Sequence, residues 1–307
     1  MELVTRPASK ADVEIVKEIA NSNLKSFNPQ EKTIGEIEAR YFITGFVDPA
    51  ITRLVKSQES DVWQGFITLN PDKSRSRFYL DIYTLPGAQT LQPSLDLALS
   101  LAREHDMNYQ LWVGKHSKDE TYKSILLGKG FDLLRRYWTM EMELPSTQEY
   151  RTNLSTSIRE IDLDSEDDLK AFHSVNQDSF SNHFGFMPRA FPEWSELVLR
   201  DRDEVNLKVW LLTIDGEDVG FLDCNDELIH EEAGFVAGLG VRKAFQGKGF
   251  GEALLMHAVN HYSKLGREKL CLNVDAGNES GALRLYEKLG MTPISEWHQY
   301  ENPNWSK

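Results

Sequence analysis

The sequence predicts two successive α/β domains, each an α+β arrangement with a mixed, largely antiparallel sheet flanked by helices. The first observation is a length of 307 residues, which suits about two domains of ordinary size. The second is an internal duplication, because residues 3–27 can be aligned without a gap to residues 156–180. This alignment pairs Arg6 with Arg159, and Ser26-Phe27 with Ser179-Phe180.

Each half has the same predicted order of elements: strand, one or two helices, three strands, helix, strand, helix and strand. The short spacing of the middle strands favours antiparallel hairpins, and the later strand–helix–strand passage favours a parallel crossover. Residues 145–156 are polar, rich in turn residues and without apolar periodicity. We therefore expect domains at 1–148 and 155–307.

Composition narrows the class of partner. The net charge of −14 argues against nucleic acid, which needs a basic face, and is compatible with a cationic small molecule or a basic peptide. The N-terminus lacks the apolar region of a secretory signal, and no apolar run approaches the length that spans a bilayer. We expect a cytoplasmic protein without a membrane partner, either a monomer or a homodimer.

The two cysteines, Cys224 and Cys271, are too few for a disulfide framework or a CxxC metal site. Both lie within apolar runs typical of strands. We predict that they are small buried core residues and that the protein holds no metal.

The most informative segment is a glycine-rich turn between a predicted strand at 233–242 and a predicted helix. The glycines are Gly247, Gly249 and Gly251, and Gly266 is placed to end the helix. The apolar residues of the helix recur at helical spacing, at Leu254, Leu255, Ala258, Val259 and Tyr262. Such a turn directs free backbone N–H groups and the positive end of the helix dipole at one point, which predicts an anion site suited to a pyrophosphate.

Two common nucleotide motifs fail on spacing. A P-loop needs Ser or Thr after Gly-Lys, whereas Gly249 follows Gly247-Lys248 here. A dinucleotide fold needs G-x-G-x-x-G, whereas these glycines are spaced G-x-G-x-G.

The segment Gln246-Gly247-Lys248-Gly249-Phe250-Gly251 instead resembles the acetyl-CoA loop of the GNAT acetyltransferase superfamily, and the flanking GLGVRKAF and EALL resemble the rest of that motif. The resemblance covers about 156–300, and within the family it is closest to tandem proteins of the mycothiol-synthase type. It implies acetyl-CoA as co-substrate. It assigns the contacts to acetyl-CoA to Leu239, Val241, Gln246, Gly247, Lys248, Gly249, Phe250, Gly251, Glu252, Asn278 and Ala282.

The segment LCLNVDAGNESGALRLYEKLGM resembles the strand and helix that follow in this family. Asn278, Ala282 and Tyr286 stand at i, i+4 and i+8 and share a helix face if the helix opens at Asn278. By resemblance, Asn278 binds the pantetheine arm, Ala282 lets the arm pass, and Tyr286 protonates the departing thiolate. Asn278 is also a good helix N-cap, and Tyr286 also fits an apolar stripe.

The general base is left open. The position that often carries glutamate in this family is Phe235 here. The other candidates are Glu231, Glu232, Asp223 and His183. By resemblance, the backbone N–H of Val241 stabilises the developing negative charge on the thioester oxygen.

The segment 179–194 carries His183, Phe184, Phe186, Phe191 and Trp194. In the resembling family this loop covers the acceptor, so an aromatic wall for a cationic or flat substrate is one interpretation. A helix-pair core is the other.

The N-terminal half departs from the motif. If Gln89 corresponds to Gln246, then Gln92 and Ser94 replace two glycines, and Pro93 removes a donor N–H. Lys118 and Leu126 stand at the positions of Asn278 and Tyr286. We expect a GNAT-like domain without a cofactor site.

The resemblance implies an acyl-CoA-dependent N-acetyltransferase that moves an acetyl group to a primary amine of a small molecule or peptide, by direct attack in a ternary complex. Two alternatives stay open. The first alternative is a non-catalytic acyl-CoA sensor with the same fold. The second is a transferase for a different acyl group.

Overall fold

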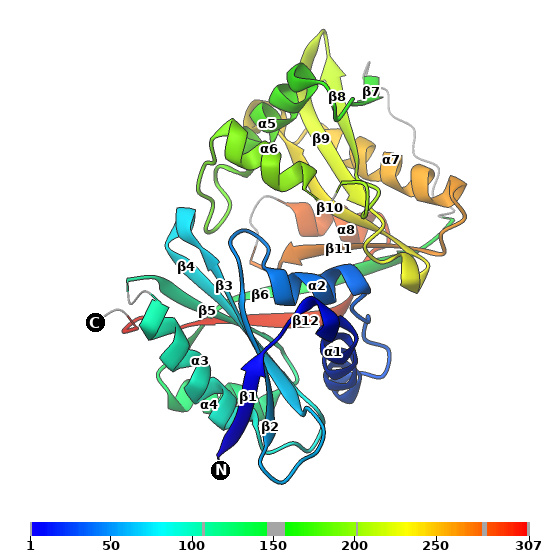
Figure 1. Cartoon of the computed structure of the whole chain (residues 1–307). Coiled ribbons are helices and arrows are strands. Elements are labelled where there is room, and N and C mark those ends of the chain that lie inside the picture. The colour runs from blue at the N-terminus through cyan, green and yellow to red at the C-terminus, as the bar shows by residue number, and fades with distance from the viewer. Residues whose placement is uncertain (1, 106–107, 146–156, 201, 278–280, 306–307) are drawn as a thin grey trace. The chain divides into compact units, whose positions relative to one another are not determined.

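The computed structural model describes residues 2–105, 108–145, 157–200, 202–277 and 281–305, and the chain divides into two compact units (Figure 1). Unit 1 comprises Met1–Trp138, Asp275–Gly277 and Ser295–Lys307. Unit 2 comprises Thr139–Val274 and Asn278–Ile294.

Unit 1 contains the first half of the sequence. Its helices are α1 (Val13–Phe27), α2 (Glu36–Thr44), α3 (Leu91–His105) and α4 (Glu120–Gly128). Its strands from this half are β1 (Leu3–Pro7), β2 (Ile51–Ser57), β3 (Gly65–Asp72), β4 (Arg77–Thr84), β5 (Gln110–His116) and the first part of β6 (Asp132–Glu143).

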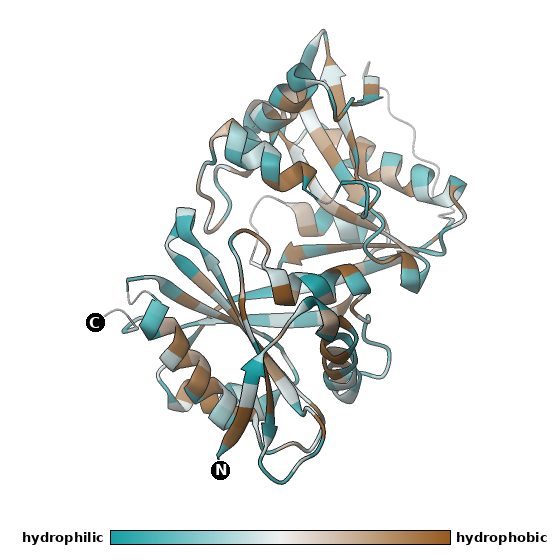
Figure 2. Cartoon of the chain, in the orientation of Figure 1, coloured by the Kyte–Doolittle hydropathy of each residue, from teal (hydrophilic) through white to brown (hydrophobic). Residues whose placement is uncertain are grey.

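Hydrophobic residues cover both faces of the unit 1 sheet. Every residue of β3 is buried, because Phe66 packs against α1 and α2 while Ile67 and Leu69 pack against α3 and α4 on the other face. Figure 2 shows the corresponding hydrophobic residues along the strands and on the helices. Strands β1 to β4 pair antiparallel, and β4 pairs with β5 in parallel.

Unit 2 repeats this element order. Its helices are α5 (Glu166–Phe180), α6 (Phe191–Leu199), α7 (Phe250–Lys264) and α8 (Ala282–Lys288). Its strands are β7 (Ser157–Glu160), β8 (Lys208–Ile214), β9 (Glu217–Asn225), β10 (Ala233–Val241) and β11 (Lys269–Asp275), followed by β12 (Thr292–Glu301). Antiparallel β8–β9–β10 and parallel β10–β11 confirm the predicted hairpins, crossover and fold class.

The last strand of each half joins the other unit. Residues 297–301 of β12 pair antiparallel with residues 112–116 of β5 in unit 1, where the red strand lies in Figure 1. The end of β6 belongs to unit 2, where the Leu144 N–H donates to the Glu268 carbonyl at 2.7 Å. The compact units therefore differ from the sequence halves at these segments. The functional division into domains 1–148 and 155–307 stays a prediction.

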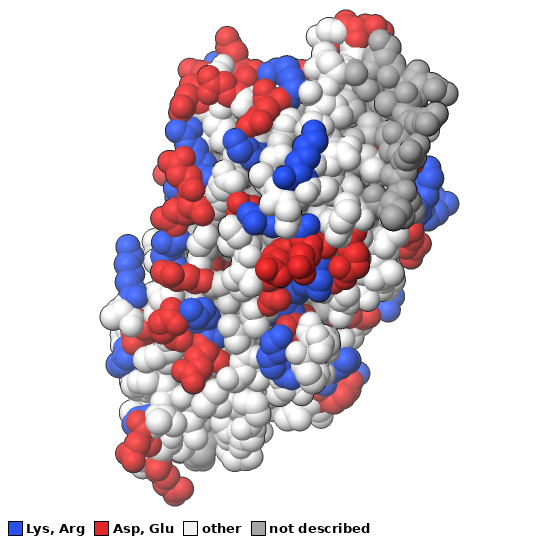
Figure 3. All heavy atoms as spheres, turned by 90° about the vertical axis from the view of Figure 1, so that its right-hand side faces the viewer, with Lys and Arg blue, Asp and Glu red and all other residues white. Residues whose placement is uncertain are grey.

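The surface and the cysteines bear on the class of protein. On the face in Figure 3, acidic and basic side chains are interspersed. No helix among the residues described is long and apolar enough to cross a bilayer. Within the same ranges, no group of three or more His, Cys, Asp and Glu side chains is placed to hold a metal ion. Cys224 and Cys271 are both buried, as predicted, and form no disulfide within the described residues.

Candidate active site

Strand β10 separates from β11 halfway along its length. The two strands pair in parallel only from Ala233 to Val236, although β10 continues to Val241. The register of β10 with β9 shifts between Val236 and Gly238, which marks a β-bulge at the point of separation. The second half of β10 therefore has one edge without a partner from β11.

The direction of the backbone groups on this edge follows from strand periodicity. The Arg242 N–H donates to the Val219 carbonyl of β9 at 2.8 Å. Because N–H groups alternate along a strand, those of Leu239 and Val241 point away from β9, toward the unpaired edge. Two oriented donors one repeat apart are therefore available to an extended ligand carrying carbonyl oxygens.

The glycine loop lies between this strand and α7, as predicted. Gly247 and Gly249 adopt left-handed φ values of 74° and 87°, and Gly249 is the N-cap of α7. The residues Gln246–Gly249 are exposed, whereas Phe250 is 5% exposed. Only the backbone of Phe250 is thus available to a ligand, and the helix N-terminus is open to an anion.

Two side chains of the loop region are held by the protein itself. Gln246 Nε2 donates to the Val241 carbonyl at 3.0 Å, which fastens the loop to the end of β10. Glu252 forms an ion pair with Lys288 of α8 at 2.6 Å. Lys248 is exposed, and its Nζ donates weakly to the Ala244 carbonyl at 3.3 Å, so its ammonium is accessible to a phosphate.

Helix α8 packs against the start of α7. A Cβ atom on Gly251 would lie 3.2 Å from the Leu285 side chain, so glycine permits this close approach. Helix α8 begins at Ala282, four residues later than predicted, because Gly281 is its N-cap with a φ of 85°. Asn278 lies outside the described residues, and its assignment stays a prediction.

Tyr286 is 7% exposed on α8, one turn after Ala282. Burial raises the pKa of the Tyr286 hydroxyl to about 12, so the proton stays on oxygen at neutral pH. The phenol is therefore a hydrogen-bond donor, as a group facing a leaving thiolate must be.

The base candidates differ in their surroundings. Phe235 packs beside a small apolar cluster, and Glu231 and Glu232 lie in the turn before β10. Asp223 lies on β9, and one of its carboxylate oxygens, Oδ1, is buried without a hydrogen-bond partner among the described residues. Burial raises the pKa of Asp223 to about 7.

Asp223 also has a suitable position. It lies opposite Gly238 in the register of β9 with β10, directly beside the point where β10 leaves β11. It shares a strand face with Phe221, whose ring packs against the rings of Phe172 and Phe180 of α5 in tilted and edge-on contacts. Asp223 therefore faces the α5–α6 side of the sheet. Its partner on β10 is Gly238, which follows the bulge and is next to Leu239.

The aromatic segment divides between the two interpretations. Trp194 is 7% exposed and stacks edge-on against Phe172 with ring centroids 4.8 Å apart, so it belongs to the core. His183 and Phe184 are exposed just beyond the end of α5, and the His183 ring contacts Phe180. An acceptor-covering role is left to the exposed residues of the segment.

Comparison with known proteins concerns the segment that contains these elements. Residues 169–291 match the model of the acetyltransferase (GNAT) family. The chain contains a GNAT acetyltransferase domain. The GNAT domain spans α5 to the end of α8, and so includes the open edge of β10, the glycine loop and Tyr286.

One curated relative is a mycothiol acetyltransferase of Propionibacterium freudenreichii, 27% identical over 54% of this chain. The match spans 53% of that relative, about half its length. Two solved structures resemble the fold of nearly the whole chain. A GCN5-related N-acetyltransferase from Sphaerobacter thermophilus has a TM-score of 0.79 at 17% identity, covering 97% of this chain and 95% of its own. A tandem GNAT protein from the clavulanic acid biosynthesis pathway has a TM-score of 0.72 at 14% identity and covers 98% of both chains.

A substitution in the loop tests the anion site. We expect Gly247→Val to weaken CoA binding at least tenfold, about 1.4 kcal/mol, because a side chain would stand where phosphates approach the N–H groups. A Cβ atom on Gly247 would meet no atom of the described residues within 4 Å, so the main cost of the substitution in the ligand-free protein is the left-handed φ of 74°. Isothermal titration calorimetry with CoA measures the effect.

The matched control is Gly216→Val in the β8–β9 turn. Gly216 also has a left-handed φ, 84°, and equally open space. Both variants thus carry a similar backbone strain, but only the first lies in the loop. Equal CoA affinity in the two variants would show that the loop does not hold the phosphates.

Proposed function

We propose that the chain transfers an acetyl group from acetyl-CoA to a primary amine of a small molecule or peptide, in a ternary complex. The observation that carries the proposal is the unpaired edge of β10, with the Leu239 and Val241 N–H groups, leading directly into the glycine loop. One continuous row of donors would thereby follow a thioester, its amide-containing arm and a pyrophosphate.

The chemistry assigns a role to each group. Asp223 accepts a proton from the acceptor ammonium; for a lysine-like amine the pKa of that ammonium is about 10.4. The free amine attacks the thioester carbonyl carbon, a C–N bond forms, and the oxyanion accepts hydrogen bonds from the β10 N–H groups. Collapse of this intermediate breaks the C–S bond while the Tyr286 hydroxyl donates a hydrogen bond to the departing sulfur. The nitrogen then loses its second proton to the thiolate through solvent, so the products are the amide and the CoA thiol, and Asp223 releases the first proton to solvent. Alignment of both substrates in one site supplies effective concentration.

A panel of amines identifies the acceptor and tests turnover. The panel contains unacetylated mycothiol precursor, because a relative is named mycothiol acetyltransferase, together with aminoglycosides, small amines and peptides. Release of free CoA thiol is the readout. Thiol release with no member, despite CoA binding, would favour a non-catalytic sensor. Faster release from longer acyl-CoAs than from acetyl-CoA would favour a different acyl group.

We expect one CoA to bind per chain, in unit 2. In unit 1 the corresponding segment contains Pro93 in the first turn of α3, and Ser94 is fully buried. Leu126, at the position of Tyr286, is also fully buried. Calorimetric titration should give a stoichiometry near one, and a value of two would contradict the assignment.

A further inference from the structure

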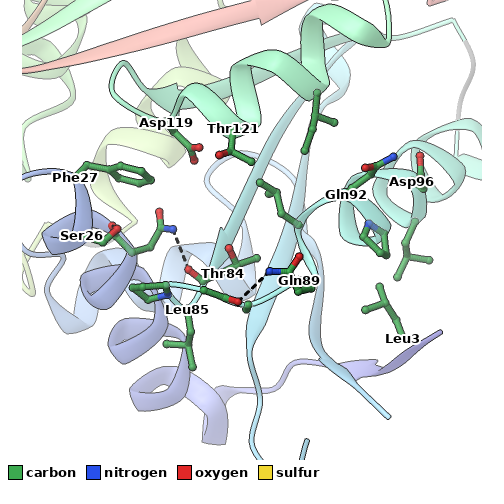
Figure 4. Close-up of a pocket in the computed structure, with 18 of the residues that line it drawn as sticks. Leu3, Ser26, Phe27, Thr84, Leu85, Gln89, Gln92, Asp96, Asp119 and Thr121 are labelled. Carbon is green, nitrogen blue, oxygen red and sulfur yellow. Dashed lines mark hydrogen bonds between the residues drawn. The ribbon is translucent and has the colours of Figure 1, made fainter. Parts of the chain in front are cut away.

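Unit 1 contains a pocket of about 1140 Å³ at the carboxyl end of β4. Its walls come from α1, from the turn after β4, and from the first turns of α3 and α4. In Figure 4, Asp119 and Thr121 of the α4 start lie on one side, and Thr84 and Leu85 lie on the other. The volume is sufficient for a small ligand.

The described residues that line the pocket include no cationic side chain. None of the residues that line it within the described ranges is Lys, Arg or His, and its two acidic residues are Asp96 and Asp119. Asp96 is paired with Lys129, and Asp119 lies 3.5 Å from the ammonium of Lys115. The lining is therefore neutral to acidic, which disfavours a phosphorylated ligand.

The ammonium of Lys115, near the pocket, is already bound by other groups of the protein. It is 3% exposed, and its Nζ donates to Asn23 Oδ1 at 3.0 Å and to the Ile82 carbonyl at 3.1 Å. Asp119 and the buried Asp81 interact with the same ammonium. Because its donors and its charge are engaged within the protein, it cannot compensate several phosphate charges.

Uncharged polar side chains line the pocket beside apolar ones. Thr84 lines the pocket, and its carbonyl, not its hydroxyl, accepts the hydrogen bond that Asn23 Nδ2 donates at 2.9 Å. Its hydroxyl is therefore available to a ligand that enters the pocket. Thr121 and Gln92 add further polar ends, and Phe27 and Leu85 supply apolar surface.

We propose that unit 1 binds an uncharged small molecule bearing hydroxyl or amide groups in this pocket, and that phosphorylated compounds, CoA included, are excluded. Thr84 donates to or accepts from the ligand at the floor, while the apolar surface contacts its carbon skeleton. This second site is independent of acetyl transfer in unit 2.

Matched pairs of probes test the proposal. The full chain, with excess CoA to occupy unit 2, is titrated calorimetrically with N-acetylglucosamine, myo-inositol and pantetheine, and with the phosphorylated form of each. We expect at least one uncharged probe to bind at least tenfold more tightly than its phosphorylated partner. Tighter binding of the phosphorylated partners, or binding of none of the uncharged probes, overturns the proposal.

Two variants locate the binding. Thr84→Val keeps the shape and removes the hydroxyl, and should weaken the uncharged probe at least fivefold. Gln92→Lys adds a cation to an exposed lining position. It should reduce the ratio of the affinity for the uncharged probe to that for its phosphorylated form at least threefold. Gln58→Lys, in the exposed turn between β2 and β3, is the charge control and should leave both affinities unchanged. If Thr84→Val binds like the parent, the ligand does not occupy this pocket.

Discussion

Replacing Tyr286 by Phe is expected to lower kcat at least 100-fold while the affinity for acetyl-CoA changes by less than threefold. General acid groups contribute about 10² to 10⁴ in rate, and the substitution removes the hydroxyl while keeping the ring. Burial raises the pKa of Tyr286 to about 12, well above that of a thiol, about 8.5. Complete proton transfer to the thiolate is therefore uphill, and a strong hydrogen bond to the developing negative charge supplies part of the effect.

Tyr262→Phe is the matched control. The Tyr262 hydroxyl, on buried α7, donates to the Asn225 carbonyl at 2.7 Å, so its loss should lower stability by about 1 kcal/mol. Its kcat should stay close to that of the parent. If Tyr286→Phe turns over within threefold of the parent, Tyr286 is a core residue and the assignment is wrong.

Replacing Asp223 by Asn is expected to lower kcat/KM about 100-fold at pH 8. In the parent, burial raises the pKa of Asp223 to about 7, so the carboxylate that accepts the proton is present above that pH. The pH profile of the parent should therefore rise through an apparent pKa near 7. Steady-state kinetics from pH 5.5 to 9 should show that rise in the parent and its loss in Asp223→Asn.

The Asp223→Asn substitution should raise stability at pH 8, although it lowers activity. The pKa of Asp223 in the folded protein lies above the usual value of about 3.9, so folding is weakened as pH rises from about 4 through 7. At pH 8, Asp223→Asn should unfold at a higher temperature than the parent. A less active and more stable variant is the signature of a functional buried acid, whereas a purely structural residue would lose both.

Asp81→Asn is the control for the loss of a buried carboxyl group that has no part in acetyl transfer. Burial also raises the pKa of Asp81, on β4 in unit 1, to about 7, with Lys115 acting in the opposite direction. Its replacement should leave the pH profile of acetyl transfer unchanged. If Asp223→Asn also leaves that profile unchanged, another group accepts the proton.

The fold and the loop were predictable because their signals are local. Gly247 and Gly249 adopt the left-handed conformations that only glycine tolerates readily, and Gly266 follows the last turn of α7 with a φ of 72°. The apolar repeat from Leu254 to Tyr262 is buried throughout. Apolar periodicity and glycine positions are patterns among neighbouring residues, so they can be recognised in a single sequence.

The remaining features depend on residues far apart in sequence. Asp223 resembles any polar residue in a strand until the register places it opposite Gly238 and covers one of its oxygens. The bulge after Val236 has no residue signature of its own, yet it opens the edge of β10. Lys115 and Thr84 likewise depend on distant residues: Lys115 Nζ donates to Asn23 Oδ1 of α1, and Thr84 lines a pocket together with residues of α1 and the start of α4.

The placement of β12 in unit 1 has a consequence for how the chain is made. Trp138 precedes Ser295 by 157 residues, so the first half leaves the ribosome long before the strand that pairs with β5 exists. At synthesis rates of about 5–20 residues per second, the edge of β5 stays uncovered for roughly ten to thirty seconds. An uncovered strand edge is a template for wrong pairing between chains. We therefore expect the nascent first half to depend on chaperones during translation, and native packing of unit 1 to be completed only once β12 has left the ribosome.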